Sequence, residues 1–416
     1  MSLLRVAWRN LGRARARTAL SVASIAAAVM VVVLLKGVVD GILGTMEDST
    51  IRLSSGHVRV IDQEYRRRER LLSLQYPVDG FDGEGYQAMV DSLTRIEGVA
   101  LVAPRLRFAG LISREDELRS TLVVAGDPGA ERELLRVDRY LAEGRFLEPG
   151  AREAVMGRRL LQRLDMQVGD RFTLVFSTAL GALRGYTLTV VGAFESGLTY
   201  LDDGAVFIPL DVAQAALDMG PAVTEVLLMG GQPGDARRLK AEVDAVLARE
   251  GAADRYLAVP WYEHNEITGF LETGRRIYDG IYIGLLVLAS FVVVNTYTMI
   301  VNERRREIGM LSALGMRPGQ VRALFLLEGA LSGLLGSVLG AAVGALVLAV
   351  LARTGLPMPG VEALGEDFMY PTVLYPAFSA GVVAYAVVGG IAVTVAAVYL
   401  PAAFAARLRP VEALRG

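Results

Sequence analysis

The amino-acid sequence predicts a membrane protein with four transmembrane helices and a large α+β extracytoplasmic domain inserted between helices 1 and 2. Two observations carry this prediction. The chain of 416 residues is 53% hydrophobic and only 21% charged, which is more apolar than most soluble proteins. Four nearly uncharged stretches also reach the roughly 20 residues that a helix needs to cross a bilayer. They lie at residues 18–40, 278–301, 321–351 and 373–400.

Arginine placement predicts the orientation of the chain, because basic residues near span ends mark the cytoplasmic side. Arginine groups precede the first span, separate the second from the third, and follow the fourth. Four crossings place all three groups on one side. Both termini are therefore expected in the cytoplasm, with residues 41–277 and the loop 352–372 outside the inner membrane, in the periplasm. The groups are Arg5, Arg9, Arg13, Arg15 and Arg17; Arg304, Arg305, Arg306 and Arg317; and Arg407, Arg409 and Arg415.

The two ends of the chain are expected to lie at the cytoplasmic face. Within residues 1–17, apolar side chains recur at helical spacing among arginines, at Leu3, Leu4, Trp8 and Leu11. This pattern predicts an amphipathic helix in the membrane interface, with Trp8 at headgroup depth. Residues 401–416 form the predicted cytoplasmic tail.

The region 41–277 is expected to fold as a domain. Strand-like stretches alternate with stretches of helical periodicity, which predicts an α+β or α/β domain in two lobes. The residues after Trp261 are expected to be helical and to continue into the second span. Strands are predicted at 57–61, 101–104, 121–125, 171–176, 186–194, 205–208, 224–229 and 256–259, and helices at 86–96, 158–164, 212–217 and 235–249.

The sequence offers no catalytic, metal or nucleotide-binding pattern. It has no cysteine, and its two histidines, His57 and His264, lack the spacing of a zinc hydrolase. Neither lysine, Lys36 or Lys240, stands in a Walker A loop. The chain is therefore expected not to be an enzyme and to bind no cofactor directly. A net charge of −2 gives no indication of nucleic-acid binding.

Small and polar residues mark the third predicted span. Gly336, Gly340 and Gly344 recur every four residues, a spacing that lets helix backbones approach closely in a bilayer. They fit either packing within the chain or contact with a second copy. Glu328 lies near the cytoplasmic end of this span, where an ionisable side chain is a functional candidate. A structural hydrogen bond or ion pair is favoured over a proton relay.

The segment 302–320, between the second and third spans, combines arginines and glutamates with an apolar stripe. Gly315 suits a left-handed helix end, and Pro318 prevents the helix from continuing. A simple basic flank would explain only the arginines. A cytosolic helix that docks into a partner also explains the stripe and the stop. The predicted contact residues are Glu303, Arg304, Arg305, Arg306, Glu307, Ile308, Gly309, Met310, Leu311 and Leu314.

Three stretches of the sequence resemble the MacB/FtsX-like family of ABC transporter permeases. ERRREIGMLSALGM (303–316) is similar to the coupling-helix segment of that family. WRNLGRARARTALS (8–21) resembles its entry into the first span, and PAAFAARLRPVEALR (401–415) its C-terminal tail. Within the domain, residues 153–170 and 188–210 are similar to lipoprotein-releasing permeases of the LolC/LolE type.

The resemblance implies one half of a type VII ABC exporter that works by mechanotransmission. Two permeases, as a homodimer or with a paralogue, would assemble with an ABC ATPase dimer that carries ATP and magnesium. ATP binding would move the coupling helices and close a stalk above the membrane. Residues from Glu303 to Leu314 would contact the ATPase, and residues 41–52 and 263–276 would form the stalk.

The function that the resemblance favours is extraction of lipoproteins from the inner membrane for transfer to a periplasmic carrier. Membrane lipids would be a further partner of the spans. The hairpin 177–185 could recruit that carrier or be an ordinary turn. One alternative is MacB-like export of a peptide, toxin or antibiotic with an outer-membrane channel, although MacB proteins typically carry a fused ATPase. Another is FtsX-like regulation of a cell-wall hydrolase, although those outer domains are generally smaller.

Overall fold

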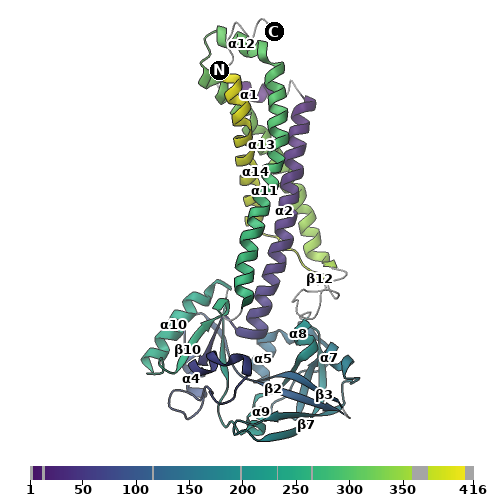
Figure 1. Cartoon of the computed structure of the whole chain (residues 1–416), viewed down its shortest axis with the longest axis vertical. Coiled ribbons are helices and arrows are strands. Elements are labelled where there is room, and N and C mark those ends of the chain that lie inside the picture. Colours follow the sequence, from purple (N-terminus) through teal and green to yellow (C-terminus); the bar gives the residue numbers. More distant parts are fainter. Residues whose placement is uncertain are drawn as a thin grey trace. The chain divides into compact units, whose positions relative to one another are not determined.

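The computed structural model describes residues 3–11, 15–114, 117–196, 199–231, 233–263, 266–357 and 373–407. They divide into two compact units, each of which can be followed in Figure 1. The membrane unit comprises the described residues up to 44, 271–357 and 373–407, and the domain comprises those of 45–270. Most of the predicted loop 352–372 and tail 401–416 lies outside the described residues, as do His264, Arg13, Arg409 and Arg415.

The membrane unit is built from long helices. Among the described residues, four helices are long and apolar enough to cross a bilayer, which confirms the predicted architecture. They follow the short helix α1 (Leu3–Leu11), and a further short helix, α12 (Arg305–Ala313), joins the second to the third. The four are α2 (Arg15–Thr50), α11 (Glu266–Glu303), α13 (Pro318–Thr354) and α14 (Ala380–Ala406).

The long helices differ from the predicted spans at their ends. Helix α2 continues without a break past residue 40, because nothing in the following stretch stops a helix before Thr50. Helix α14 begins at Ala380 rather than at 373. Before it, strand β12 (Val373–Leu374) pairs with β11 (Leu356–Pro357), and the Ser379 hydroxyl then accepts a hydrogen bond from Val382 N–H at 3.3 Å. That cap fixes the helix start.

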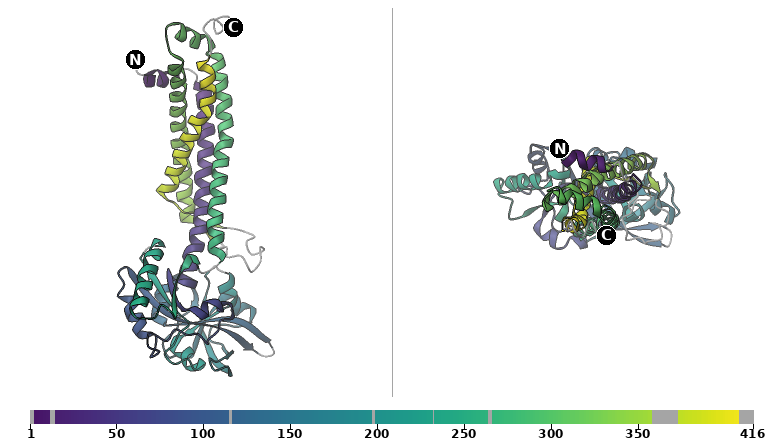
Figure 2. Two further views of the ribbon diagram at one scale, coloured as in Figure 1. Left: turned by 60° about the vertical axis from the view of Figure 1, so that its left-hand side comes forward. Right: turned by 90° about the horizontal axis from the view of Figure 1, so that it is seen from above.

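The four long helices share one apolar core, and Figure 2 shows them running side by side. Each contributes buried side chains, such as Val29 from α2, Val293 from α11, Leu348 from α13 and Ala386 from α14. Many larger apolar side chains point outward instead, including Leu288 and Phe291 of α11. An apolar outer surface is what a lipid environment requires.

The domain contains one ten-stranded sheet in its described residues, so the predicted two lobes are replaced by a continuous sheet. The strand order is β10-β1-β9-β2-β3-β8-β5-β7-β4, and β6 pairs with both β2 and β7. Most pairs are antiparallel, whereas β3 with β8 and β5 with β7 are parallel. The strands are β1 (Val58–Asp62), β2 (Val99–Arg114), β3 (Glu117–Gly126), β4 (Leu141–Gly144), β5 (Glu153–Gly157), β6 (Arg171–Ser177), β7 (Leu183–Phe194), β8 (Ala205–Pro209), β9 (Glu225–Gly230) and β10 (Tyr256–Pro260).

Strand β2 makes the sheet continuous. It pairs with β9 through its first half and with β3 and β6 further along, so two predicted lobes become one. Helices cover the sheet, and its two faces bury separate apolar clusters, one around Leu106 and Phe108 and one around Val124 and Phe207. The helices are α3 (Gln63–Arg67), α4 (Gln87–Thr94), α5 (Pro128–Leu135), α6 (Val137–Tyr140), α7 (Arg158–Arg163), α8 (Thr199–Gly204), α9 (Leu210–Leu217) and α10 (Ala236–Arg249).

The domain begins with a π-helix, Ile51–Ser55, that directly continues α2. Its wider turn is visible in the hydrogen bond from Gly56 N–H to Ile51 O at 2.7 Å. The buried guanidinium of Arg105 donates to Leu53 O at 3.2 Å and also pairs with Glu131. Single π turns cost stability and persist where neighbouring groups hold them. Arg105 is such a group.

Candidate functional site

The predicted coupling segment is a short helix between two spans. Helix α11 ends at Glu303, Arg304 leaves the helical region with φ −91° and ψ 13°, and α12 follows. The bend keeps its backbone hydrogen bonds. Arg304 N–H donates to Ile300 O at 3.0 Å, and Ile308 N–H donates to Arg304 O at 2.9 Å. The direction of the chain therefore changes without leaving these backbone groups unpaired.

Helix α12 ends at the predicted glycine. Gly315 has φ +96°, a conformation that favours glycine. Met316 N–H donates to Leu311 O and Gly315 N–H donates to Ser312 O, both at 3.1 Å, which is the Schellman pattern. Pro318 is then the first residue of α13, where its missing N–H leaves no intrahelical bond unmade. Helix α12 therefore ends at a defined residue.

The apolar stripe of this helix faces two directions. Ile308 is only 3% exposed and packs in the membrane-unit core with Val321 and Phe325. Gly309 beside it is also buried. By contrast, Met310 is 51%, Leu311 39% and Leu314 86% exposed. The stripe therefore anchors the helix through Ile308 and presents the other three side chains on its surface.

The charged contact residues of this segment differ in exposure. Glu303, Arg305, Arg306 and Glu307 are all exposed, whereas Arg304 is half-buried and turns toward the bundle. The Arg305 guanidinium lies 6.0 Å from the centroid of the Phe404 ring on α14, at the outer limit of a cation–π contact. We define the coupling surface as Met310, Leu311 and Leu314 with Arg305 and Arg306.

A buried polar network holds the coupling segment to the bundle. Glu328 of α13 is 4% exposed, and its carboxylate accepts a hydrogen bond from Asn10 Nδ2 at 2.6 Å. Arg304 Nη1 lies 3.4 and 3.5 Å from the two carboxylate oxygens. Arg304 Nη2 also donates to the backbone oxygen of Asn10 at 3.3 Å. Three elements, α1, the α11–α12 bend and α13, therefore meet at one carboxylate.

This geometry favours the structural interpretation of Glu328 over the proton relay. Both carboxylate oxygens have donors, and a guanidinium and an amide supply the hydrogen bonds. Buried charges persist in proteins when they are paired in this way. The network ties the bend before α12 to α1 and α13.

The glycines of α13 pack within the chain. A Cβ at Gly340 would lie 2.2 Å from the backbone oxygen of Ala26 on α2. At Gly336 it would lie 2.8 Å from Ile25, and at Gly344 3.0 Å from Val33. The face of α13 that carries these three glycines therefore lies against α2. Of the two roles that the spacing allows, the structure shows intrachain packing.

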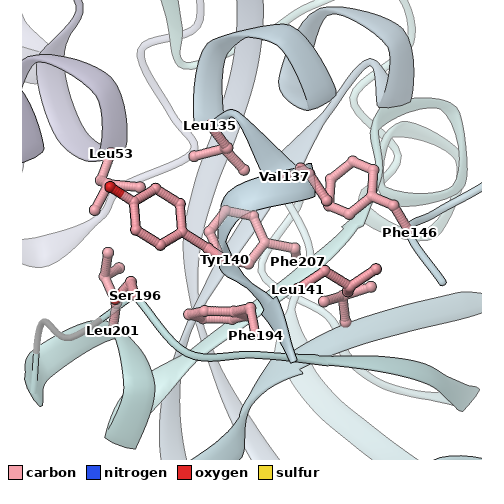
Figure 3. Close-up of a pocket in the computed structure, with 11 residues that line it drawn as sticks. Leu53, Leu135, Val137, Tyr140, Leu141, Phe146, Phe194, Ser196, Leu201 and Phe207 are labelled. Atoms are coloured by element: carbon pink, nitrogen blue, oxygen red, sulfur yellow. The ribbon is translucent and has the colours of Figure 1, made fainter. Parts of the chain in front are cut away.

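The domain contains an apolar pocket that no pattern in the sequence predicts (Figure 3). Its cavity is about 30 Å³. Phe194 and Phe207 meet edge to face at 5.1 Å on one side, and Leu53 of the π-helix reaches it from another. Most of the lining side chains belong to one buried apolar cluster of the domain.

Of the two histidines, His57 lies among the described residues and has a backbone partner. His57, just before β1, accepts a hydrogen bond from Gly230 N–H at Nδ1 over 3.0 Å. Burial lowers the pKa of this imidazole below its ordinary 6.5, with smaller opposing contributions from nearby carboxylates. Within the described parts of the chain, no group of three or more histidine, cysteine, aspartate or glutamate side chains could hold a metal ion.

The sequence-based prediction missed the partners of the coupling segment. Asn10 was the available signal, since it is the uncharged polar residue of an otherwise apolar and basic helix. Its contact with Glu328 joins residues 318 positions apart, which no local pattern can indicate. Phe404 was missed for the same reason. The role of the coupling surface in binding an ATPase stays a prediction.

Comparison with known protein families matches most of the chain. Residues 18–246 match the family described as MacB-like periplasmic core domain, which is more than half of the chain. Residues 280–410 match the family described as FtsX-like permease C-terminal. In sequence order, these two matches cover the first span with most of the domain, and then the last three spans.

Individual relatives resemble the chain at low sequence identity. The chain is 25% identical over 244 residues to the lipoprotein-releasing system transmembrane protein LolC of Neisseria meningitidis, covering 57% of this chain and 58% of the relative. It is 29% identical over 235 residues to the macrolide export ATP-binding/permease protein MacB 1/2 of Paracoccus denitrificans, covering 55% and 32%. The periplasmic region of MacB from Actinobacillus actinomycetemcomitans matches with 12% identity and a TM-score of 0.35, covering 53% of this chain and 95% of that structure.

Proposed function

The chain belongs to the MacB-like periplasmic core domain family, and from this premise we propose that it is the transmembrane subunit of an ABC transporter that extracts lipoproteins from the inner membrane. The protein would hand its cargo to a periplasmic carrier. Sequence similarity to a LolC protein over more than half of the chain supports this cargo class. Arginine placement supports cytoplasmic termini and a periplasmic domain.

The observation that carries the proposal is the coupling surface. It presents three exposed apolar side chains beside arginines on a helix that is tied to the bundle through Ile308, Arg304 and Glu328. Surfaces with an apolar centre and a basic rim are typical of protein interfaces. The chain has no Walker A sequence, so the proposed occupant is the ABC ATPase dimer, which would bring ATP and magnesium.

The helices supply the proposed path for the force. Helix α11 runs unbroken from Glu266 to Glu303, about 57 Å at 1.5 Å per residue, and ends at the bend before α12. The Arg304 network ties this bend to α1 and α13. A displacement of α12 is therefore expected to move the ends of all three helices. A second permease copy, identical or paralogous, would complete the transporter.

The proposal is tested by reconstitution. The chain is co-expressed with the ABC ATPase encoded beside it, purified as a complex and placed in proteoliposomes that contain a lipoprotein. ATP is expected to release the lipoprotein to a soluble carrier, while ADP releases none. If ATP is hydrolysed by an intact complex and the lipoprotein stays in the membrane in the presence of the carrier, the cargo assignment is wrong.

A MacB-like exporter is the second candidate, supported by the 29% identity to a MacB protein of Paracoccus denitrificans. That relative is named as an ATP-binding/permease protein, and the match covers 32% of its length. In this reading the domain would contact a periplasmic adaptor rather than a lipoprotein carrier. Co-purification of an adaptor and an outer-membrane channel, with no lipoprotein release, would favour it.

A further inference from the structure

A second polar cluster lies inside the membrane unit, away from the coupling segment. Lys36 of α2 is one of only two lysines in the chain. Its ammonium lies 3.5 Å from Asp279 Oδ1 on α11 and 3.7 Å from Asp40 Oδ2 one helical turn away. It also lies 5.1 Å from the ring centroid of Tyr282 and 5.0 Å from that of Tyr385 on α14. We call these five residues the lysine cluster.

The position of the cluster along the helices corresponds to the lipid headgroups opposite the coupling segment. Lys36 follows Thr18, the first residue of its span, by about 27 Å of helix, close to the roughly 30 Å thickness of the hydrocarbon core. Aromatic side chains with 36–55% exposure lie at the same end of the membrane unit, as in the aromatic belts of membrane proteins. They are Tyr278, Tyr375, Phe378 and Tyr385.

The charges of the cluster do not balance. One ammonium faces two carboxylates, which leaves a surplus negative charge. The side chain of Lys36 is 18% exposed, whereas those of Asp40 and Asp279 are 33% and 52% exposed. The cation therefore lies inside and the carboxylates lie where a ligand can reach them. The outer side of the cluster would therefore attract the cationic group of a ligand.

A buried hydroxyl adds a second, independent observation. Tyr282 is 1% exposed, and its Oη has no hydrogen-bond partner among the described residues. A buried O–H without a partner costs free energy, so such groups usually have an acceptor. The ring of this tyrosine lies beside the Lys36 ammonium, so the cluster holds two donors for an anion as well as two acceptors for a cation.

The geometry points to a binding site for the headgroup of an ethanolamine phospholipid. Its phosphate would accept hydrogen bonds from Lys36 and the Tyr282 hydroxyl. Its primary ammonium would donate to Asp279 and Asp40 over the face of Tyr385. A choline headgroup has no N–H to donate, and a glycerol headgroup has no cation. This inference does not depend on the cargo proposed above.

Native mass spectrometry of the full-length protein tests the site. The protein is released from micelles that contain equal amounts of phosphatidylethanolamine, phosphatidylcholine and phosphatidylglycerol with identical acyl chains. The wild type is expected to retain the ethanolamine lipid about two- to fivefold over the other two, the ratio for one half-exposed charged contact. Equal retention of all three lipids by the wild type would overturn the proposal without any variant.

Variants separate a lipid site from a purely structural ion pair. Asp279→Asn and Lys36→Met are expected to abolish the preference, whereas Lys36→Arg keeps the cation and should keep it. The matched control is Lys240→Met, which removes the other lysine from its pair with Asp244 on the exposed face of α10. If Asp279→Asn, isosteric and half-exposed, binds the ethanolamine lipid as the wild type does, the site is wrongly assigned.

A soluble headgroup distinguishes a lipid from a free metabolite. Glycerophosphoethanolamine carries the same ammonium and phosphate without acyl chains. Added in excess, it is expected to leave the bound lipid in place, because the chains contribute most of the affinity. Replacement of the lipid by this compound at equal concentration would show that the site takes a free phosphoethanolamine compound, and would overturn the assignment to a membrane lipid.

Discussion

The domain and the membrane unit each bury an arginine–glutamate pair, and the two pairs differ in geometry. In the domain, Arg105 Nε and Nη2 reach the two oxygens of Glu131 at 2.5 and 2.7 Å, and both side chains are at most 2% exposed. In the membrane unit, Arg304 Nη1 lies 3.4 Å or more from Glu328 and its side chain is 16% exposed. The Arg105–Glu131 pair is bidentate and buried, and we call it the closed pair. The Arg304–Glu328 pair is longer, partly exposed and shared with Asn10, and we call it the open pair.

The difference in geometry between the two pairs corresponds to a difference in what each pair holds in position. Arg105 also donates to Leu53 O of the π-helix, so the pair holds the π-helix to β2 within the domain. A short bidentate pair permits little rearrangement without leaving a charge unpaired. The Arg304 pair can lengthen or exchange partners at lower cost because Asn10 and solvent remain available. The joint that we propose at the coupling segment would need that freedom.

Removing the carboxylate of the closed pair should have the largest effect on stability. Glu131→Gln leaves the Arg105 guanidinium buried without its counter-charge, which should lower the free energy of unfolding by about 3–5 kcal/mol. Thermal unfolding of the full chain in micelles measures it. Glu133→Gln, an exposed glutamate on the same helix α5, is the control and should change little. Equal melting temperatures for the two variants would contradict the comparison.

Disturbing the contact between α13 and α2 should have the second-largest effect on stability. Gly340→Ala places a Cβ 2.2 Å from the backbone oxygen of Ala26, so the helices must separate, at about 1–3 kcal/mol. Gly284→Ala on α11 is the matched control, since a Cβ there meets no atom within 4 Å. The melting temperature should fall only for Gly340→Ala. If both variants melt like the wild type, α13 and α2 are not in close contact.

Removing the carboxylate of the open pair should destabilise the protein less than removing the carboxylate of the closed pair. Glu328→Gln keeps the hydrogen bond from Asn10 and leaves Arg304 partly exposed to solvent, so a loss of about 1–2 kcal/mol is expected. The decisive quantity is the difference between this variant and Glu131→Gln under one set of conditions. A destabilisation as large as that of Glu131→Gln would show that the pair at the coupling segment is as rigid as the pair in the domain.

The smallest predicted effect concerns pH. Burial lowers the pKa of His57, so the unfolded chain binds a proton below pH 6.5 that the folded domain does not. Stability is therefore expected to fall as the pH drops through 6.5. In His57→Gln this contribution is absent, and its melting temperature should depend less steeply on pH over that range. Parallel curves for the two proteins would contradict the burial of a neutral imidazole.

The sequence predicts the spans and the coupling helix well because their signals are local. Twenty apolar residues, an arginine group and the pair Gly315 and Pro318 each act within a few turns of helix. Gly315 has the expected positive φ. The direction of Ile308 was not predictable, since an apolar stripe does not reveal which of its members faces the bundle. Burial of Ile308 also makes it unsuitable for testing the surface, unlike Leu314.

The features that could not be predicted from the sequence depend on contacts between residues that lie far apart in the chain. The long strand β2 joins what looked like two lobes, because its pairing with β9 and β6 is set by tertiary contacts. Asp279 and Lys36, which lie 243 positions apart, meet only when α2 and α11 pack. The π-helix likewise depends on Arg105, which comes from β2. Local patterns carry no information on such contacts.

The central claim is that the coupling surface receives the ATPase. Pull-down of the ATPase by the double variant Met310→Asp and Leu314→Asp tests it, since both side chains are more than half exposed and lie outside the apolar core. Leu71→Asp, a 74% exposed leucine of the domain, is the control. The double variant should melt like the wild type and bind the ATPase at least about tenfold more weakly, while the control binds normally. Unchanged binding by the folded double variant would contradict the account.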